Sequence, residues 1–229
     1  MKNHKSFYDN RLVTKPWGYE YTIFRNSNKI AITFLHIKYK HKTSLHCHPK
    51  KKTGFIIVDG TAQVQLGLYD KNKKNYKSIS SLVIRPGLFH SIKSLSKKGL
   101  CALEFETPVD KKDLIRFRDS YGREKDPYEN FNTTKKINAK LIKLKTSKHK
   151  KIQKTTFKNT KIFLENHKNF NTKIKNSDKS ISAILDGKIV DKFNRTVITY
   201  GEIVKTLTLK KLSQKYKVDK NMQVLRVSK

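Results

Sequence analysis

Three histidines are spaced so that their imidazoles could share one metal ion. His46 and His48 lie two residues apart in the segment TSLHCHPKKKTGFIIVDG, and side chains at i and i+2 of a strand point to the same face. His90 follows a Pro86-Gly87 turn in the segment LVIRPGLFHS. A lone histidine on a strand is more often an ordinary core or surface group. Three neutral imidazoles that meet inside one sheet, however, are a common ligand set for a divalent metal.

The elements that must position these histidines read as short β-strands. Alternating or apolar segments are separated by Gly and Pro turns at a spacing of roughly 8 to 12 residues, without helical periodicity. Asp59-Gly60 is the strongest local turn signal and predicts a hairpin over 54–66. The pattern is typical of an antiparallel sandwich or barrel of the jelly-roll kind, which could bring His90 to the other two histidines.

A change in composition near residue 125 predicts a second, smaller unit. Between Asn130 and Leu164 there are eleven lysines and no acidic residue, which is typical of a linker because like charges repel. Beyond this block, SAILDGKIV is similar to IIVDGTAQV, and VITYGEIV is similar to LVIRPGLFH with Val204 in place of His90. We therefore expect a β domain at 11–124, a basic linker at 125–164, and a degenerate β repeat without a metal site at 165–229.

Composition narrows the classes of partner. The 229 residues carry a formal net charge of +34 at pH 7, which favours an anionic partner such as nucleic acid or a phosphorylated substrate. Only eight of the 52 basic residues are arginine, so a lysine-rich solvated surface is the preferred interpretation. There is no apolar run long enough to span a bilayer and no signal-peptide core. We therefore expect a cytoplasmic protein in which Cys47 and Cys101 are free thiols.

Several motifs, in order, resemble those of one family. HCHPKKKTGFIIVDG with RPGLFH resembles the two motifs of the cupin superfamily, which bind a metal inside a β-barrel. KPWGYE, SLHCHPKKKTGFIIVDGTAQV and DLIRFRDSYGR, within 11–124, are similar to the cupin domain of type II mannose-6-phosphate isomerases. The resemblance covers about residues 11–124 and implies a cupin jelly-roll barrel there. Together with the lysine-rich linker and the smaller degenerate cupin-like unit expected from the charge run and the internal repeat, this gives an all-β fold. By analogy, it also implies a homodimer.

The resemblance also implies the ligands of the metal. His46, His48 and His90 match the family's His-x-His and final His, so a divalent ion such as zinc, manganese, iron or nickel is expected. The position of the family's metal-binding Glu falls on Thr53 in this chain. A missing carboxylate removes a negative charge from the site, so we expect weakened metal binding.

An aldose–ketose isomerase needs further groups besides a metal. It moves a proton between C1 and C2 of the sugar, so it needs a base within hydrogen-bond reach and a cation for the substrate phosphate. The candidates for the base are Glu104 and Glu106 on the last predicted strand. The candidates for the phosphate contact are lysines near the expected mouth of the barrel, although solvated surface is the preferred interpretation of each one taken singly: Lys42, Lys50, Lys51 and Lys52.

Three functions follow from these features. The first is a metal-dependent sugar-phosphate isomerase that acts on mannose 6-phosphate and fructose 6-phosphate, in activated-sugar or polysaccharide biosynthesis. The second, suggested by Thr53, is a non-catalytic cupin that binds a sugar phosphate or sugar nucleotide. The third is a protein that binds polyanions such as nucleic acid through the basic linker, in which case binding should survive moderate salt.

Overall fold

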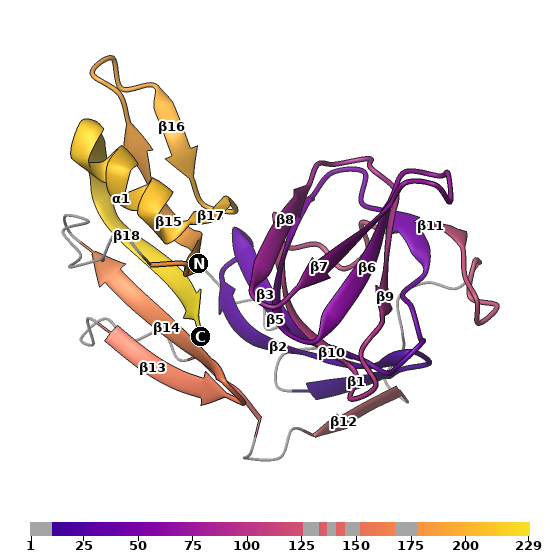
Figure 1. Ribbon diagram of the computed structural model, residues 1–229. Helices are drawn as coiled ribbons and strands as arrows, with labels where there is room; N and C mark the ends of the chain where they lie inside the picture. The colour runs from indigo at the N-terminus through magenta and orange to yellow at the C-terminus, as the bar shows by residue number, and fades with distance from the viewer. Residues whose placement is uncertain (1–10, 126–132, 137–140, 145–151, 168–177) are drawn as a thin grey trace. The chain divides into compact units, whose positions relative to one another are not determined.

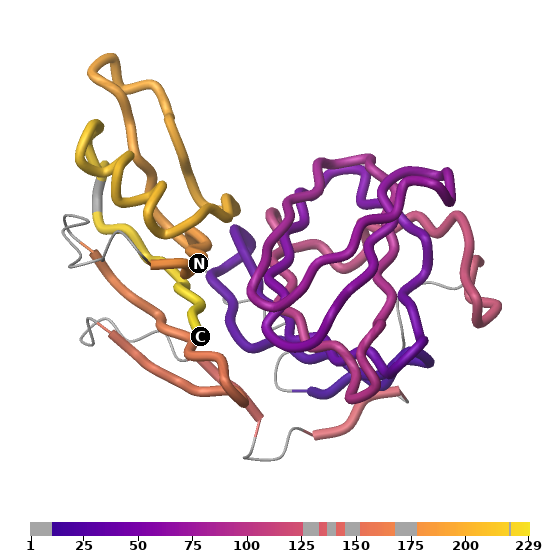
Figure 2. The backbone as a smooth tube through the Cα atoms, viewed as in Figure 1, coloured from indigo at the N-terminus to yellow at the C-terminus, as the bar shows by residue number. Residues whose placement is uncertain are grey.

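The computed structural model describes residues 11–125, 133–136, 141–144, 152–167 and 178–229, and the structural statements below concern these residues (Figure 1). The backbone forms two compact units, Met1–Lys143 and Leu144–Lys229 (Figure 2). The first unit contains twelve described strands: β1 (Arg11–Lys15), β2 (Gly18–Asn26), β3 (Ile30–Ile37), β4 (Leu45–Cys47), β5 (Lys52–Asp59), β6 (Thr61–Leu66), β7 (Lys73–Lys77), β8 (Ser80–Ile84), β9 (His90–Ser94), β10 (Leu100–Thr107), β11 (Ile115–Arg118) and β12 (Thr134–Lys136).

Two antiparallel sheets build the first unit around one core. The described strands of one sheet run in the order β12-β1-β2-β3-β10-β5-β8, and those of the other in the order β11-β4-β9-β6-β7. Leu35 and Phe55 from the first sheet and Val64 and Ile92 from the second join a single buried apolar cluster, together with Trp17 from the β1–β2 turn. Since side chains of both sheets share this core, the sheets face each other, and the predicted all-β architecture is confirmed.

The Asp59-Gly60 turn is a corner between the two sheets, so the predicted hairpin is wrong. β5 pairs with β8 and β10, whereas β6 pairs with β7 and β9. Gly60 has a φ of +85°, and a Cβ at this position would lie 2.8 Å from the carbonyl oxygen of Gly99. A hairpin and a corner both need positive φ here, which is why the local signal did not distinguish them.

The second unit is one antiparallel sheet with a helix on it. Its elements in the described residues are β13 (Ile152–Phe157), β14 (Thr160–His167), β15 (Ile181–Val190), β16 (Thr196–Thr199), β17 (Ile203–Lys205), α1 (Thr206–Lys215) and β18 (Lys217–Ser228). The strand order is β13-β14-β18-β15-β16, with β17 beside β15. Leu209 of α1 packs in a buried cluster with Ile184, Met222 and Val224 of the sheet. No helix in the described ranges has the length and hydropathy needed to cross a membrane.

Two features of the second unit differ from the sequence-based expectation. The segment compared with the 54–66 turn does not reverse direction, because β15 runs through it as one strand with an irregularity at Asp186. β13 and most of β14 lie within the range assigned to a basic linker. Ile162 and Leu164 are buried while Lys161 is exposed, so lysines on the alternate face of a strand account for part of the charge run.

Candidate metal centre

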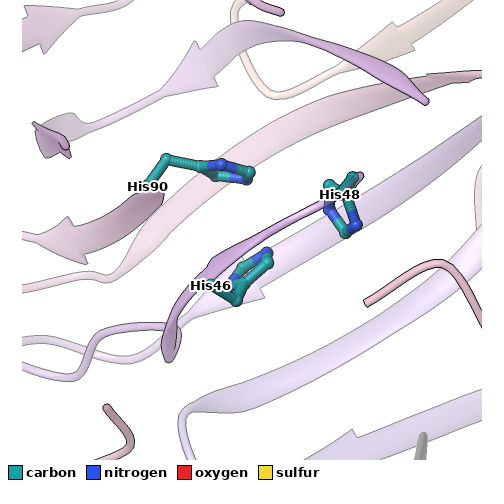
Figure 3. Close-up of side chains that lie close together, drawn as sticks. All are labelled: His46, His48 and His90. Carbon is teal, nitrogen blue, oxygen red and sulfur yellow. The ribbon is translucent and has the colours of Figure 1, made fainter. Parts of the chain in front are cut away.

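The structure brings the imidazoles of His46, His48 and His90 together (Figure 3). His46 on β4 lies directly opposite His90 on β9, and His48 follows β4 on the same face as His46. The ligand nitrogens of the three rings lie within 4.8 Å of one another. This separation is small enough for a single metal ion to contact all three nitrogens.

Hydrogen bonds fix the orientation and the tautomer of each ring. Each Nδ1 donates to a backbone carbonyl oxygen: His46 to Ser44 (2.8 Å), His48 to Asp113 (2.6 Å) and His90 to Leu88 (3.0 Å). Since a carbonyl oxygen only accepts, the proton is on Nδ1 and the lone pair is on Nε2. The Nε2 atoms of His48 and His90 are buried and have no hydrogen-bond partner among the described residues. Buried lone pairs without a protein partner are available to a metal ion.

The electrostatics keep the three imidazoles neutral. Burial lowers the pKa of His48 to about 3, with a further contribution from the nearby Lys51 ammonium. Burial lowers the pKa of His90 to about 4. The pKa of His46 is also well below its usual value, because of burial and then the neighbouring His90 and His48 rings. Neutral imidazole is the form that binds metal, so the residues present fit a divalent ion.

Backbone contacts hold the two histidine segments in place. The Gly87 amide, in the predicted Pro-Gly turn, donates to the His48 carbonyl oxygen at 2.8 Å. The carboxylate of Asp113 accepts the Lys50 amide at 3.0 Å and the Lys51 amide at 2.9 Å, and the Asp113 carbonyl accepts the His48 ring. Asp113 therefore joins the segment after the His-x-His pair to the chain that precedes β11. Asp113 is the first residue of the family-like motif DLIRFRDSYGR, but the sequence analysis gave it no role.

The triad lies in a pocket with many charged groups. Besides the histidines, its charged lining consists of Lys15, Glu20, Lys51, Glu104, Glu106, Lys111, Arg116 and Arg123. Burial, followed by the charge of Glu106, raises the pKa of Glu104 to about 7. Burial alone would raise the pKa of Glu106, but Lys111 and Lys51, each in an ion pair at 2.9 Å, lower it to about 2. The two carboxyl groups therefore differ in protonation at neutral pH, as is typical of an acid–base site.

The other predicted site residues lie in different places. Glu104, Glu106 and Lys51 line the pocket, and Lys51 is buried in an ion pair. Lys42, Lys50 and Lys52 are outside the lining that the described residues form, and Lys42 and Lys50 are exposed. Local spacing placed all four lysines near the barrel mouth. It could not show which one of them turns inward.

Sequence reasoning missed five of the residues that form or support the pocket. Four of them are cationic lining residues within or next to the family-like motifs, and the fifth is the aspartate described above: Lys15, Lys111, Arg116, Arg123 and Asp113. Strand alternation would have pointed Arg116 outward, because it stands between the apolar Ile115 and Phe117, whereas the structure exposes these two residues and turns Arg116 to the pocket. Lys15 ends β1, and Lys111, Asp113 and Arg123 lie in turns and loops, where no period applies.

The position of the family's carboxylate is occupied by a buried hydroxyl. Thr53 is only 1% exposed, and its Oγ1 has no hydrogen-bond partner within the described part of the chain. In the sheet, Thr53 lies directly opposite Glu106 on β10. The carboxylate opposite Thr53 thus comes from the neighbouring strand and is paired with Lys51 and Lys111. Weakened metal binding stays a prediction.

Comparison with known proteins places the first unit in a family. Residues 2–119 match the family model described as "Mannose-6-phosphate isomerase C-terminal". No curated protein sequence matches the chain.

Solved structures with a similar fold include three bacterial proteins. A double-stranded β-helix protein of Klebsiella pneumoniae has 15% identity and a TM-score of 0.36, over 39% of this chain and 70% of the other. KdgF from Halomonas sp. has 14% identity and a TM-score of 0.37, over 42% of this chain and 84% of KdgF. The capsular polysaccharide assembling protein CapF from Staphylococcus aureus has 13% identity and a TM-score of 0.42, over 47% of this chain and 34% of CapF. The match thus spans about a third of CapF.

Proposed function

Because this chain belongs to the mannose-6-phosphate isomerase C-terminal family of cupin domains, we propose that its first unit is a metal-dependent sugar-phosphate isomerase. The reaction would interconvert mannose 6-phosphate and fructose 6-phosphate, in the supply of activated sugars for polysaccharide synthesis. The observation that supports this proposal best is the set of three converging imidazoles, two of them with buried Nε2 atoms, in one pocket with a carboxyl group of raised pKa.

The metal would be held by Nε2 of His46, His48 and His90. When bound, a divalent ion would polarise the carbonyl and hydroxyl oxygens between which the sugar's proton moves. The carbonyl groups that accept from each Nδ1 keep the lone pairs directed at a common point. The protein's own backbone therefore orients the ligand set.

Glu104 is the group best suited to carry the proton between C1 and C2. It lies on β10 directly opposite Phe55 of β5, and the centre of the Phe55 ring is 6.2 Å from that of the His90 ring. With a pKa of about 7, both of its protonation states are populated at neutral pH. A group that must accept a proton and return it works best near this value. Glu106 keeps its charge through Lys51 and Lys111, so it supports Glu104 without competing for the proton.

An isomerisation assay combined with elemental analysis tests this proposal. The full chain, loaded with zinc or manganese, is expected to convert mannose 6-phosphate and to hold about one metal per chain. Glu104→Gln should lower kcat by about 10²- to 10⁴-fold and leave the metal content unchanged. His46→Ala should lose the metal. Glu124→Gln, which lies outside the pocket lining, is the matched control.

A non-catalytic cupin that binds a sugar phosphate is the second candidate. Thr53 favours it, because a buried hydroxyl replaces the carboxylate that the family uses to hold its metal. Binding of mannose 6-phosphate by metal-free protein, without conversion after metal loading, would support this candidate over the isomerase. Binding of polyanions through residues 125–164 stays a prediction, because much of that range lies outside the described residues.

A further inference from the structure

We propose that Arg116 binds the phosphate group of the substrate beside the metal centre and thereby selects phosphorylated over neutral sugars. The identity of the sugar rests on the function proposed above. The role of Arg116 as an oxyanion-binding residue rests on its position in the sheet, on the charge of the pocket and on the geometry of the guanidinium group.

The register of the second sheet places Arg116 next to the metal ligands. β9, β4 and β11 are adjacent strands, and His90, His46 and Arg116 lie directly opposite one another across them. Directly opposite residues of antiparallel strands have Cβ atoms about 4.5–5.5 Å apart on the same face. The neighbours of Arg116 along β11, Ile115 and Phe117, are 52% and 50% exposed. The Arg116 side chain therefore points to the histidine side, where it lines the pocket.

The charge of the pocket calls for an anionic ligand. Among the described residues, the lining contains five cationic side chains and three carboxyl groups. Asp119 neutralises Arg123 from the loop after β11, with an N–O distance of 2.9 Å, and cations are still in excess. Histidines that hold a metal are neutral, so a divalent ion would add to this positive charge. A phosphate dianion would balance it, whereas a neutral sugar would leave a buried excess of positive charge.

A hydrogen bond to a neighbouring loop orients the guanidinium group of Arg116. Its Nη1 donates to the carbonyl oxygen of Arg123 at 3.4 Å. The loop that carries this carbonyl is closed by Asp119, which accepts from the Arg123 side chain at 3.0 and 2.9 Å and from the Arg123 amide at 3.1 Å. A planar guanidinium held in this way can present two parallel donors to a phosphate, which a lysine ammonium cannot do.

Calorimetric titration of the zinc-loaded full chain with mannose 6-phosphate, inorganic phosphate and mannose tests this inference. We expect Arg116→Gln to raise the Kd for mannose 6-phosphate about 10- to 100-fold and to remove the preference over mannose. Arg116→Lys keeps the charge without the fork and should raise this Kd less than Arg116→Gln does. Arg118→Gln is the matched control, because Arg118 is an exposed arginine of the same strand, and its Kd should stay within about twofold of that of the unmodified chain.

The outcomes separate this inference from the proposed function. Phosphate-selective binding that disappears in Arg116→Gln supports the role of Arg116 even if the unmodified chain isomerises nothing. An unchanged Kd in Arg116→Gln, or an unmodified chain that binds mannose as well as mannose 6-phosphate, overturns it even if isomerisation is observed. If Arg116→Gln does not fold or loses its zinc, the comparison of Arg116→Lys with Arg118→Gln decides. Equal Kd values for these two variants would overturn the inference.

Discussion

Replacement of Asp113 by alanine should weaken both the fold and the metal site of the first unit. Asp113 is 7% exposed, and its carboxylate accepts the amides of Lys50 and Lys51 while its carbonyl accepts the His48 ring. The substitution keeps the carbonyl group but removes the carboxylate that anchors it. The segment that orients His48 is then held less firmly.

The magnitude follows from the two amides that lose their acceptor. Lys50 is exposed and its amide can turn to water, whereas Lys51 is buried and its amide is left without a partner. Hydrogen bonds to a charged group contribute about 1.5–3 kcal/mol each, so we expect a loss of about 2–4 kcal/mol in the free energy of unfolding. Disturbing a group that orients a metal-binding histidine typically costs about 10- to 100-fold in metal affinity.

Chemical denaturation of the metal-free protein and competition titration of zinc measure the two effects separately. Asp113→Asn keeps one acceptor oxygen and should lie between alanine and the unmodified chain. Asp110→Ala is the control, because Asp110 is exposed on the same segment and, within the described residues, its carboxylate accepts the local amide of Lys112. The reasoning is refuted if Asp113→Ala unfolds within about 0.5 kcal/mol of the unmodified chain and also binds zinc within about twofold.

Three further perturbations test other parts of the structure. His90 has a pKa of about 4 in the folded protein, below its unfolded value, so the unfolded chain binds more protons below pH 6.5. Acid therefore removes the stability that neutral His90 contributes. Between pH 6.5 and 4, the metal-free protein should lose more free energy of unfolding than His90→Gln, and parallel curves of stability against pH would contradict this. Gly18→Ala should lower the free energy of unfolding by more than about 3 kcal/mol or prevent folding, because its Cβ would lie 1.9 Å from the His36 carbonyl oxygen. Gly87→Ala has no atom within 4 Å of the added Cβ, so a thermal melt should show a loss of only about 1 kcal/mol. Lys50→Ala should change the Kd for mannose 6-phosphate by less than about threefold, because the Lys50 side chain is exposed. A large rise in this Kd would restore Lys50 as a binding residue. Lys51→Met should lower the free energy of unfolding by about 3 kcal/mol, because it removes an ion-pair partner of buried Glu106.

Local spacing was sufficient to pick out the three histidines of the candidate metal centre. His46 and His48 share a face because side chains alternate along a strand, and this period holds whatever the strand pairs with. The Pro-Gly turn before His90 likewise depends on local backbone preferences, and Gly87 has the positive φ of +74° that such a turn needs. These features are local in sequence, so the sequence alone predicted them.

Strand pairing determined the features that local spacing did not predict. Gly60 marks a turn in the sequence, but whether β5 and β6 pair or part at that turn depends on which strands lie beside them. Arg116 meets His46 only because β11 pairs with β4, about 70 residues earlier in the chain. Lys111 and Asp113 reach the site from a segment without any period. Contacts between distant segments depend on sheet register and on closure of the barrel around its apolar core, so only the tertiary structure determined the charged half of the site.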